Sequence, residues 1–224
     1  MNYNNIIEMV KNQLGPPILI SLAGSRSFKI EKDLSDYDFS CYLDIKKNKE
    51  GKTEHIENNN FDFFYLSKDY LNDIRFCSSI FFLRDINNII YCNTTTLLEF
   101  INNNKKDLMN INPHATYQLC LSMIEHDKKW NLQYRQIQFA EILKNFYYYG
   151  DFSKSLELSE ETKKLYRELK DRKKVLSESE LNQYLEVLYT PSFKNYFYTF
   201  EPNIKLHQEF VKVLNEGGEL NGVT

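Results

Sequence analysis

The sequence predicts an α+β protein, with a mixed β-sheet core flanked by helices in its first half and an all-helical second half. Short apolar runs bounded by Gly, Pro and Asn occur between residues 17 and 92, which is typical of strands. Beyond residue 107, apolar residues instead recur at helical spacing over longer stretches. We therefore expect one domain over residues 1–107 and a helical domain over 108–224, divided near the polar segment 102–107.

The composition is that of a globular protein and points to no special partner. A 42% hydrophobic and 26% charged chain of 224 residues can bury a sizeable core. The net charge of -3 gives no overall attraction to nucleic acid or anionic lipid, so we expect no strong nucleic-acid footprint. The four cysteines and four histidines lack metal-ligand spacing and suggest thiols in a reducing compartment. Since no apolar run is long enough for a membrane span, we expect a soluble cytoplasmic protein without a membrane partner.

The first elements are a helix and a strand. Apolar residues at helical spacing predict a helix over residues 3–14, which Gly15 and the prolines after it end. Residues 18–23 form a short apolar run, as in a buried strand. The chain then turns at residues 24–26, and residues 27–34 form a short helix or an irregular loop.

The next strands carry the acidic residues of interest. Residues 37–44 alternate in character, so that Asp36 and Asp38 share one face and the aromatic residues lie on the other. The polar residues 46–52 predict a hairpin loop leading to a strand over 53–56. A stronger strand follows over residues 61–66. It contains Asp62, a carboxylate in an apolar run, which is costly unless it is paired or binds a metal.

The remaining residues predict two further strands and then helices. Ser67 is a candidate N-cap for a helix through residue 76. Residues 80–83 and 89–92 resemble two short strands around a turn, and a helical pattern resumes over 94–102. Later helices are expected from Pro113, over 132–149 with a stop at Gly150, after Ser159, from the capping box at Ser177 to Pro191, and over 204–214, before a frayed tail from residue 216.

The three aspartates suggest a magnesium site. Asp36 and Asp38 point the same way, about 6–7 Å apart along the strand, and Asp62 could complete the set from a neighbouring strand. Magnesium prefers oxygen ligands and keeps waters and substrate phosphates in its shell, so that two or three carboxylates suffice. Two bridged magnesium ions, or manganese in their place, neutralise a triphosphate and activate a hydroxyl.

The corner at residues 24–26 suggests a phosphate site. Backbone N–H groups at Gly24 and Ser25 could cradle phosphates, and the Ser25 hydroxyl and Arg26 would add donors. Taken separately, a Gly-Ser pair is usually a turn, and an Asp-x-Asp is usually a solvated strand end. The combination of strand, corner and strand with a later buried acidic residue favours the functional interpretation.

These residues also resemble a known family. The string Leu22-Ala23-Gly24-Ser25, followed after ten residues by Asp36-Tyr37-Asp38-Phe39, resembles the signature of the nucleotidyltransferase superfamily that includes DNA polymerase β. The fuller pattern Gly-Ser-Arg…Ser-Asp-Tyr-Asp is similar to a branch of predicted bacterial and phage nucleotidyltransferases. The resemblance covers residues 18–76 well and the helical half loosely.

The resemblance implies a magnesium-dependent enzyme that moves a nucleoside monophosphate from a nucleoside triphosphate to an acceptor hydroxyl and releases pyrophosphate. It makes residues 1–107 the catalytic domain and 108–224 the domain that closes the cleft and selects the acceptor. The residues it assigns are the metal ligands Asp36, Asp38 and Asp62, the last as ligand or base, and the phosphate contacts Gly24 and Ser25. Lys29 stands where that branch has a second glycine, and could itself contact phosphate.

Several alternatives stay open at this level. The acceptor is a small molecule (such as an aminoglycoside-like antibiotic), a protein side chain or an RNA end. A non-catalytic nucleotide- or partner-binding module, such as an antitoxin-like regulatory protein, is the rival function. Arg75 and Arg84 could line the triphosphate path, but we expect them to face solvent. The secondary candidates for the cleft are Lys128, Lys129, Arg135 and His126, and the run 147–149 is expected to pack rather than to stack on a base.

Overall fold

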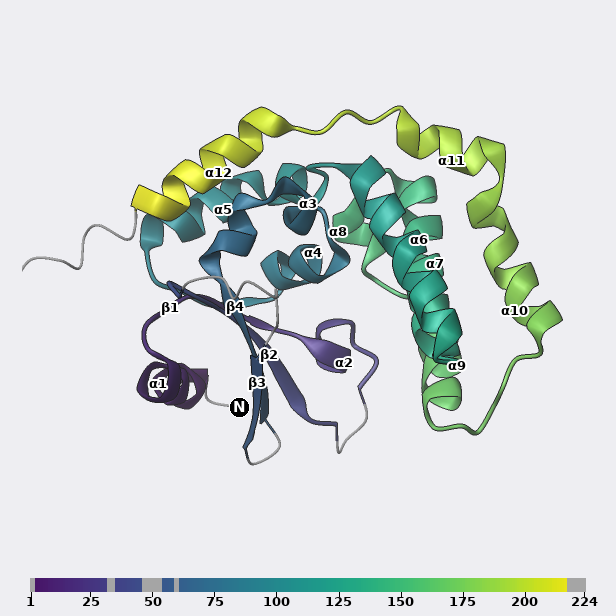
Figure 1. Ribbon diagram of the computed structural model, residues 1–224, viewed down its shortest axis with the longest axis horizontal. Coiled ribbons are helices and arrows are strands. Elements are labelled where there is room, and N and C mark those ends of the chain that lie inside the picture. Colours follow the sequence, from purple (N-terminus) through teal and green to yellow (C-terminus); the bar gives the residue numbers. More distant parts are fainter. Residues whose placement is uncertain (1–2, 32–34, 46–53, 59–60, 217–224) are drawn as a thin grey trace, which may run out of the picture.

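The computed structural model describes residues 3–31, 35–45, 54–58 and 61–216, and its arrangement is shown in Figure 1. Within these ranges a five-stranded sheet has the order β3-β4-β2-β1-β5. The strands are β1 (Pro17–Leu22), β2 (Tyr37–Leu43), β3 (Glu54–Asn58), β4 (Phe61–Ser67) and β5 (Ile89–Cys92). Strands β2 and β4 pair in parallel and the other neighbours pair antiparallel, so the sheet is mixed. The α+β class is confirmed.

One face of the sheet is covered by helix α1 (Tyr3–Leu14), as Figure 1 shows. Ile6 and Val10 on this helix pack against Phe39 of β2 and Phe63 of β4, and all four side chains are buried. Because side chains alternate along a strand, Asp38, Ser40 and Asp62 lie on the opposite face. The alternation expected for this strand is therefore correct, and it separates an apolar face from a face with chemistry.

The opposite face is covered by short helices. They are the 3₁₀-helix η1 (Lys68–Asn72), α3 (Ile74–Cys77), α4 (Ile80–Asn87), α5 (Thr95–Met109) and α12 (Ile204–Glu216). Figure 1 shows α3, α4, α5 and α12 together on the side of the sheet away from α1. Ser67 is an N-cap as expected, since its hydroxyl accepts from the Asp69 N–H. The single helix expected through residue 76 is wrong, because Asp73 caps a new helix at Arg75.

Two expectations about strands are corrected. Strand β3 pairs with β4 and not with β2, so β2 and β3 do not form a hairpin; the predicted loop at 46–52 itself lies outside the described residues. Strand β4 lies inside the sheet between β3 and β2, and β3 lies at the edge.

Residues 80–87 form helix α4 and not a strand. Ser79 is its N-cap, with its hydroxyl accepting from the Phe82 N–H at 3.3 Å. Ile80, Leu83 and Ile86 are buried at helical spacing, which a short apolar run cannot distinguish from a strand by pattern alone. This helix brings Arg84 to Ser40 on the face of the sheet opposite α1, which bears on the site described below.

The second half of the chain is helical, as predicted. Its elements are α6 (Pro113–Lys129), α7 (Gln133–Tyr149), α8 (Phe152–Ser155), α9 (Glu160–Lys170), α10 (Glu178–Leu185), η2 (Glu186–Tyr189) and α11 (Pro191–Tyr198). Gly150 ends α7 in the left-handed conformation with φ of 64°, and Ser177 forms the predicted capping box. Pro191 begins α11.

The two halves share one hydrophobic core. Tyr42 of the sheet and Leu83 of α4 belong to the same buried cluster as Phe146 of α7 and Leu185 of α10. The polar segment 102–107 lies inside the continuous helix α5. The division into two domains at this segment stays a prediction. Within the described ranges, none of the helices combines the length and the apolar character that crossing a membrane requires.

Candidate active site

The corner after β1 brings Gly24 under the carboxylate of Asp38. The Ala23 N–H donates to the Asp38 carbonyl at 2.7 Å, which joins the end of β1 to the start of β2. Gly24 has φ of 58°, a left-handed conformation that favours glycine. A Cβ at this position would lie 2.9 Å from the Asp38 Cβ and overlap its carboxylate. Glycine is therefore required here for both its conformation and its small size.

The aspartates lie on adjacent strands. Asp38 and Asp62 are direct partners in the parallel register of β2 and β4, and Asp36 is exposed just before β2. Burial raises the pKa of the Asp38 carboxyl; the negative charge of Asp62 and, to a smaller extent, that of Asp36 raise it further. Among the described residues no group of three or more His, Cys, Asp or Glu side chains is gathered closely enough to hold a metal. The three-carboxylate magnesium site stays a prediction.

Arg26 stabilises the loop that carries these aspartates. Its guanidinium donates to the carbonyls of Ser35 at 2.6 Å and Asp36 at 3.3 Å, and it lies 3.8 Å from the centre of the Tyr37 ring. These contacts fix the approach to β2 and occupy part of its donor capacity. Its predicted contact with nucleotide stays a prediction.

Lys29 adopts a backbone conformation that favours glycine. Its φ is 56°, in the left-handed region, and its N–H donates to the Arg26 carbonyl at 3.1 Å. The side chain is exposed and lines neither of the cavities described next. The lysine therefore holds this turn at a cost in backbone strain.

Two adjoining cavities meet at Asp38. Both are lined by Gly24, Asp38, Phe64, Phe81, Arg84 and Arg135. The first, which we call the helix-side cavity, has a volume of about 430 Å³ and extends to Tyr166 and Lys170 of α9. The second, the sheet-side cavity, has a volume of about 510 Å³ and extends to Leu66 of β4 and Phe76 of α3. The predicted aspartate thus lies where two spaces join.

Arg84 is held at this junction by a buried network. It is only 9% exposed, and its Nε donates to Asp85 at 2.8 Å while a terminal nitrogen donates to the Ser40 hydroxyl at 2.9 Å. The Asp85 carboxylate also accepts from the Tyr42 hydroxyl at 2.6 Å. Burial raises the pKa of the Asp85 carboxyl, and the Arg84 guanidinium opposes that shift. The expectation that Arg84 faces solvent is wrong, since α4 brings it beside Asp38, whose pKa its charge lowers.

The helical half supplies the opposite wall. Arg135 of α7 forms an ion pair with the buried Asp127 at 3.1 Å and lines both cavities, as was considered for it from the sequence. Lys170 of α9 lowers the pKa of Asp38 by its charge. Burial raises the pKa of the Tyr166 hydroxyl, and the charge of Asp38 contributes to the shift. Arg167 donates to the Ile30 carbonyl at 3.3 Å and joins α9 to the corner.

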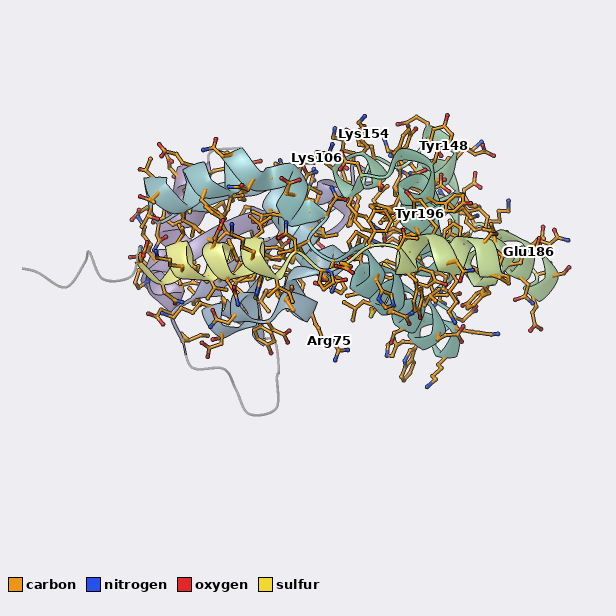
Figure 2. The ribbon with its side chains drawn as sticks, turned by 90° about the horizontal axis from the view of Figure 1, so that it is seen from above. Arg75, Lys106, Tyr148, Lys154, Glu186 and Tyr196 are labelled. Carbon is orange, nitrogen blue, oxygen red and sulfur yellow. The ribbon has the colours of Figure 1, made fainter. Side chains whose placement is uncertain are left out.

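The other secondary candidates lie elsewhere. Arg75 is exposed, as expected, and Figure 2 shows it pointing away from the ribbon. Lys128 lines a separate cavity between α6, α7 and α10, and Lys129 is exposed. His126 lies beside Asp127 at 3.4 Å. Tyr148 is 81% exposed and points outward in Figure 2, so the run 147–149 packs only in part.

Comparison of the chain with family models, curated proteins and solved structures finds no match. The site therefore has to be interpreted from its own geometry. Sequence reasoning missed Lys170, Tyr166 and Phe81, which reach the cavities from α9 and α4. Lys170 is the last residue of α9, and no local signal in the sequence relates that helix end to Asp38.

Proposed function

We propose that the chain is a magnesium-dependent nucleotidyltransferase, which moves a nucleoside monophosphate from a nucleoside triphosphate to an acceptor hydroxyl and releases pyrophosphate. The observation that carries this proposal is the position of Asp38. Its carboxylate lies over Gly24, beside its strand partner Asp62, and at the junction of two cavities that three cationic side chains line. A two-substrate transfer needs such a junction, because both substrates must meet at the reacting atoms.

The donor set fits magnesium. Asp36, Asp38 and Asp62 would hold the metal through carboxylate oxygens, the ligands that magnesium prefers. The raised pKa of Asp38 reflects first its burial and then the negative charge of Asp62, and a bound divalent cation would relieve this repulsion. When bound, magnesium neutralises the charge of the phosphates and lowers the pKa of an attacking hydroxyl.

The residues of the chain supply binding and orientation. Arg84 and Arg135 present guanidinium groups to both cavities, and Lys170 adds an ammonium to the helix-side cavity. Guanidinium groups match phosphate oxygens in geometry and charge. Arg84 is already fixed by its buried bonds to Asp85, so it loses little freedom on binding an anion. We assign the triphosphate to the helix-side cavity, next to Gly24 and Ser25.

The mixed sheet, the corner and the order of the aspartates are those expected of the nucleotidyltransferase core. We therefore extend the proposal to the fold, with the helices after α5 as the wall that closes the cleft. The rival function, a non-catalytic nucleotide-binding module, predicts nucleotide binding that does not depend on the aspartates.

Magnesium-dependent nucleotide binding tests this proposal. Binding of ATP and GTP to the full chain is measured by calorimetry with magnesium and with EDTA, for the wild type and for the double variant Asp36→Ala/Asp38→Ala. The proposal expects binding that needs magnesium and is lost in the variant. Equally strong binding in all four conditions would remove the catalytic interpretation.

A further inference from the structure

The two cavities that meet at Asp38 differ in the residues that only one of them has. The helix-side cavity alone adds a cation, Lys170, and the polar Ser25 and Gln138, besides apolar and aromatic side chains such as Phe28 and Phe139. The sheet-side cavity adds Leu66 and Phe76, together with the polar residues Ser40 and Asp85. The additional cation favours the triphosphate in the helix-side cavity and leaves the sheet-side cavity for the second substrate.

The two polar side chains that only the sheet-side cavity has are already paired within the protein. The Ser40 hydroxyl accepts from Arg84 at 2.9 Å, and the Asp85 carboxylate accepts from Arg84 at 2.8 Å and from Tyr42 at 2.6 Å. Asp85 is fully buried and Ser40 is 2% exposed. A ligand that inserted polar groups at this end would leave them without partners, which costs free energy. Apart from contacts with the guanidinium groups of Arg84 and Arg135, the buried part of the ligand must therefore be apolar.

The remaining lining favours a ring. Phe64 and Phe81 border the cavity where it joins the site, and Leu66 and Phe76 border its far part. Aromatic side chains pack well against another flat ring, in stacked or edge-on arrangements. Phe81 is 39% exposed, although it lies on a helix with a buried face, so its ring is accessible to a ligand.

The charge of the cavity argues against a polycation. Arg84 and Arg135 both line it, and the one carboxylate beyond Asp38 is Asp85, whose charge Arg84 compensates. A polyamine-like acceptor such as an aminoglycoside needs unpaired acidic groups around it. A nucleobase at an RNA end would bring several hydrogen-bonding edges into a space whose polar groups are engaged.

We infer that the sheet-side cavity is the acceptor subsite and takes a hydroxyl carried on an apolar aromatic ring, that is, a phenol. The inference rests on the proposed function. The phenolic oxygen forms a bond to the α-phosphorus of the nucleoside triphosphate, the bond from that phosphorus to the pyrophosphate oxygen breaks, and the hydroxyl proton passes to a carboxylate of the site. The same group is carried by a free phenol and by a tyrosine side chain.

The test uses the full chain with magnesium, each α-labelled nucleoside triphosphate and four acceptors. These are 4-ethylphenol, N-acetyl-tyrosinamide, an aminoglycoside and a short RNA with a free 3′ end. We expect label on one or both of the phenols, and their comparison tells a small molecule from a tyrosine. Label on the RNA or the aminoglycoside, with the phenols unlabelled, would overturn the inference and leave the proposed function standing.

Two variants separate the cavities. Leu66→Ala removes a contact that only the sheet-side cavity has, and we expect the KM for the phenol to rise about tenfold with the KM for the triphosphate unchanged. Lys170→Ala, in the helix-side cavity, is the matched control and should raise the KM for the triphosphate alone. The reverse pattern, or equal effects of both variants on both substrates, contradicts the assignment.

A binding measurement distinguishes failure of the inference from failure of the proposed function. Binding of 4-ethylphenol is followed by nuclear magnetic resonance for the wild type and for Leu66→Ala. Weaker binding in the variant supports the sheet-side cavity as the binding site of the phenol. If no acceptor becomes labelled in that case, the proposed reaction is wrong but the assignment of the binding site stands. If the wild type does not bind the phenol, the inference is wrong.

Discussion

Replacement of Gly24 by alanine probes the contact on which the site depends. The residue has φ of 58°, and an alanine in this region costs about 1–2 kcal/mol. Its Cβ would also overlap the Asp38 carboxylate, so this side chain must move; overpacking of this kind costs about 1–3 kcal/mol more. We expect Gly24→Ala to lose about 2–5 kcal/mol of unfolding free energy. A displacement of about 1 Å at a reacting group lowers turnover about 100-fold.

Gly15→Ala is the matched control. Gly15 also has a positive φ, 91°, but a Cβ there would meet no atom within 4 Å. Gly15→Ala should lose only the unfolding free energy that the positive φ costs an alanine, and its turnover should equal that of the wild type. Urea unfolding gives the stability of both variants, and release of pyrophosphate gives their activity. Normal turnover in Gly24→Ala would refute the reasoning, because the carboxylate would then not need its place over the glycine.

Three further predictions follow from the described contacts. The first is that Asp38→Asn, without magnesium, should raise the melting temperature at pH 7 but leave it unchanged well below pH 3.8, the ordinary pKa of an aspartate. The reason is that the native pKa of Asp38 is raised, so that its ionised form destabilises the fold as pH rises through the native pKa. No gain in melting temperature at pH 7 would contradict this. Lys29→Gly should stabilise by about 1 kcal/mol in urea unfolding, since φ of 56° strains a lysine, and a loss would show that its side chain contributes a contact. Phe146→Ala should lower the free energy of unfolding by about 3–5 kcal/mol, since the ring is fully buried and stacks on Phe152 at 4.0 Å. Calorimetry should show one transition, because both halves of the chain contribute to the core around Phe146, and two transitions would contradict a shared core.

Local signals in the sequence predicted the elements whose start or stop is marked by particular residues. The capping box at Ser177 and the stop at Gly150 give helix ends that the structure confirms. The strands around Asp38 and Asp62 were predicted from alternation and apolar runs, and both exist. Such signals depend on neighbouring residues and can be read without knowledge of the tertiary fold.

The parts that failed depend on contacts across the chain. Residues 80–87 carry an apolar run that suits either a strand or a buried helix, and only packing decides between them. The parallel pairing of β2 with β4 and the edge position of β3 depend on contacts between strands, which alternation within one strand does not reveal. Arg84 was expected in solvent because only one of its partners, Asp85, is near it in sequence. The other, Ser40, lies on β2 and is brought to Arg84 by the tertiary fold.

The candidate site was predicted in the same uneven way. The aspartates and Gly24 come from a compact segment with recognisable spacing. The cations of the opposite wall, Arg135 and Lys170, come from helices far along the chain and have no motif. Their approach to Asp38 is a property of the tertiary structure, and the structure was needed to find it.

The most direct measurement of the central claim is transfer of label from an α-labelled nucleoside triphosphate by the wild type and by Asp38→Asn. Pyrophosphate release is recorded with magnesium at pH 7 in the presence of the acceptors named above, and melting curves verify that the variant is folded. We predict release of pyrophosphate and labelled acceptor by the wild type and neither by the folded variant. Equal release by both proteins would contradict the assignment of Asp38 to the reacting site.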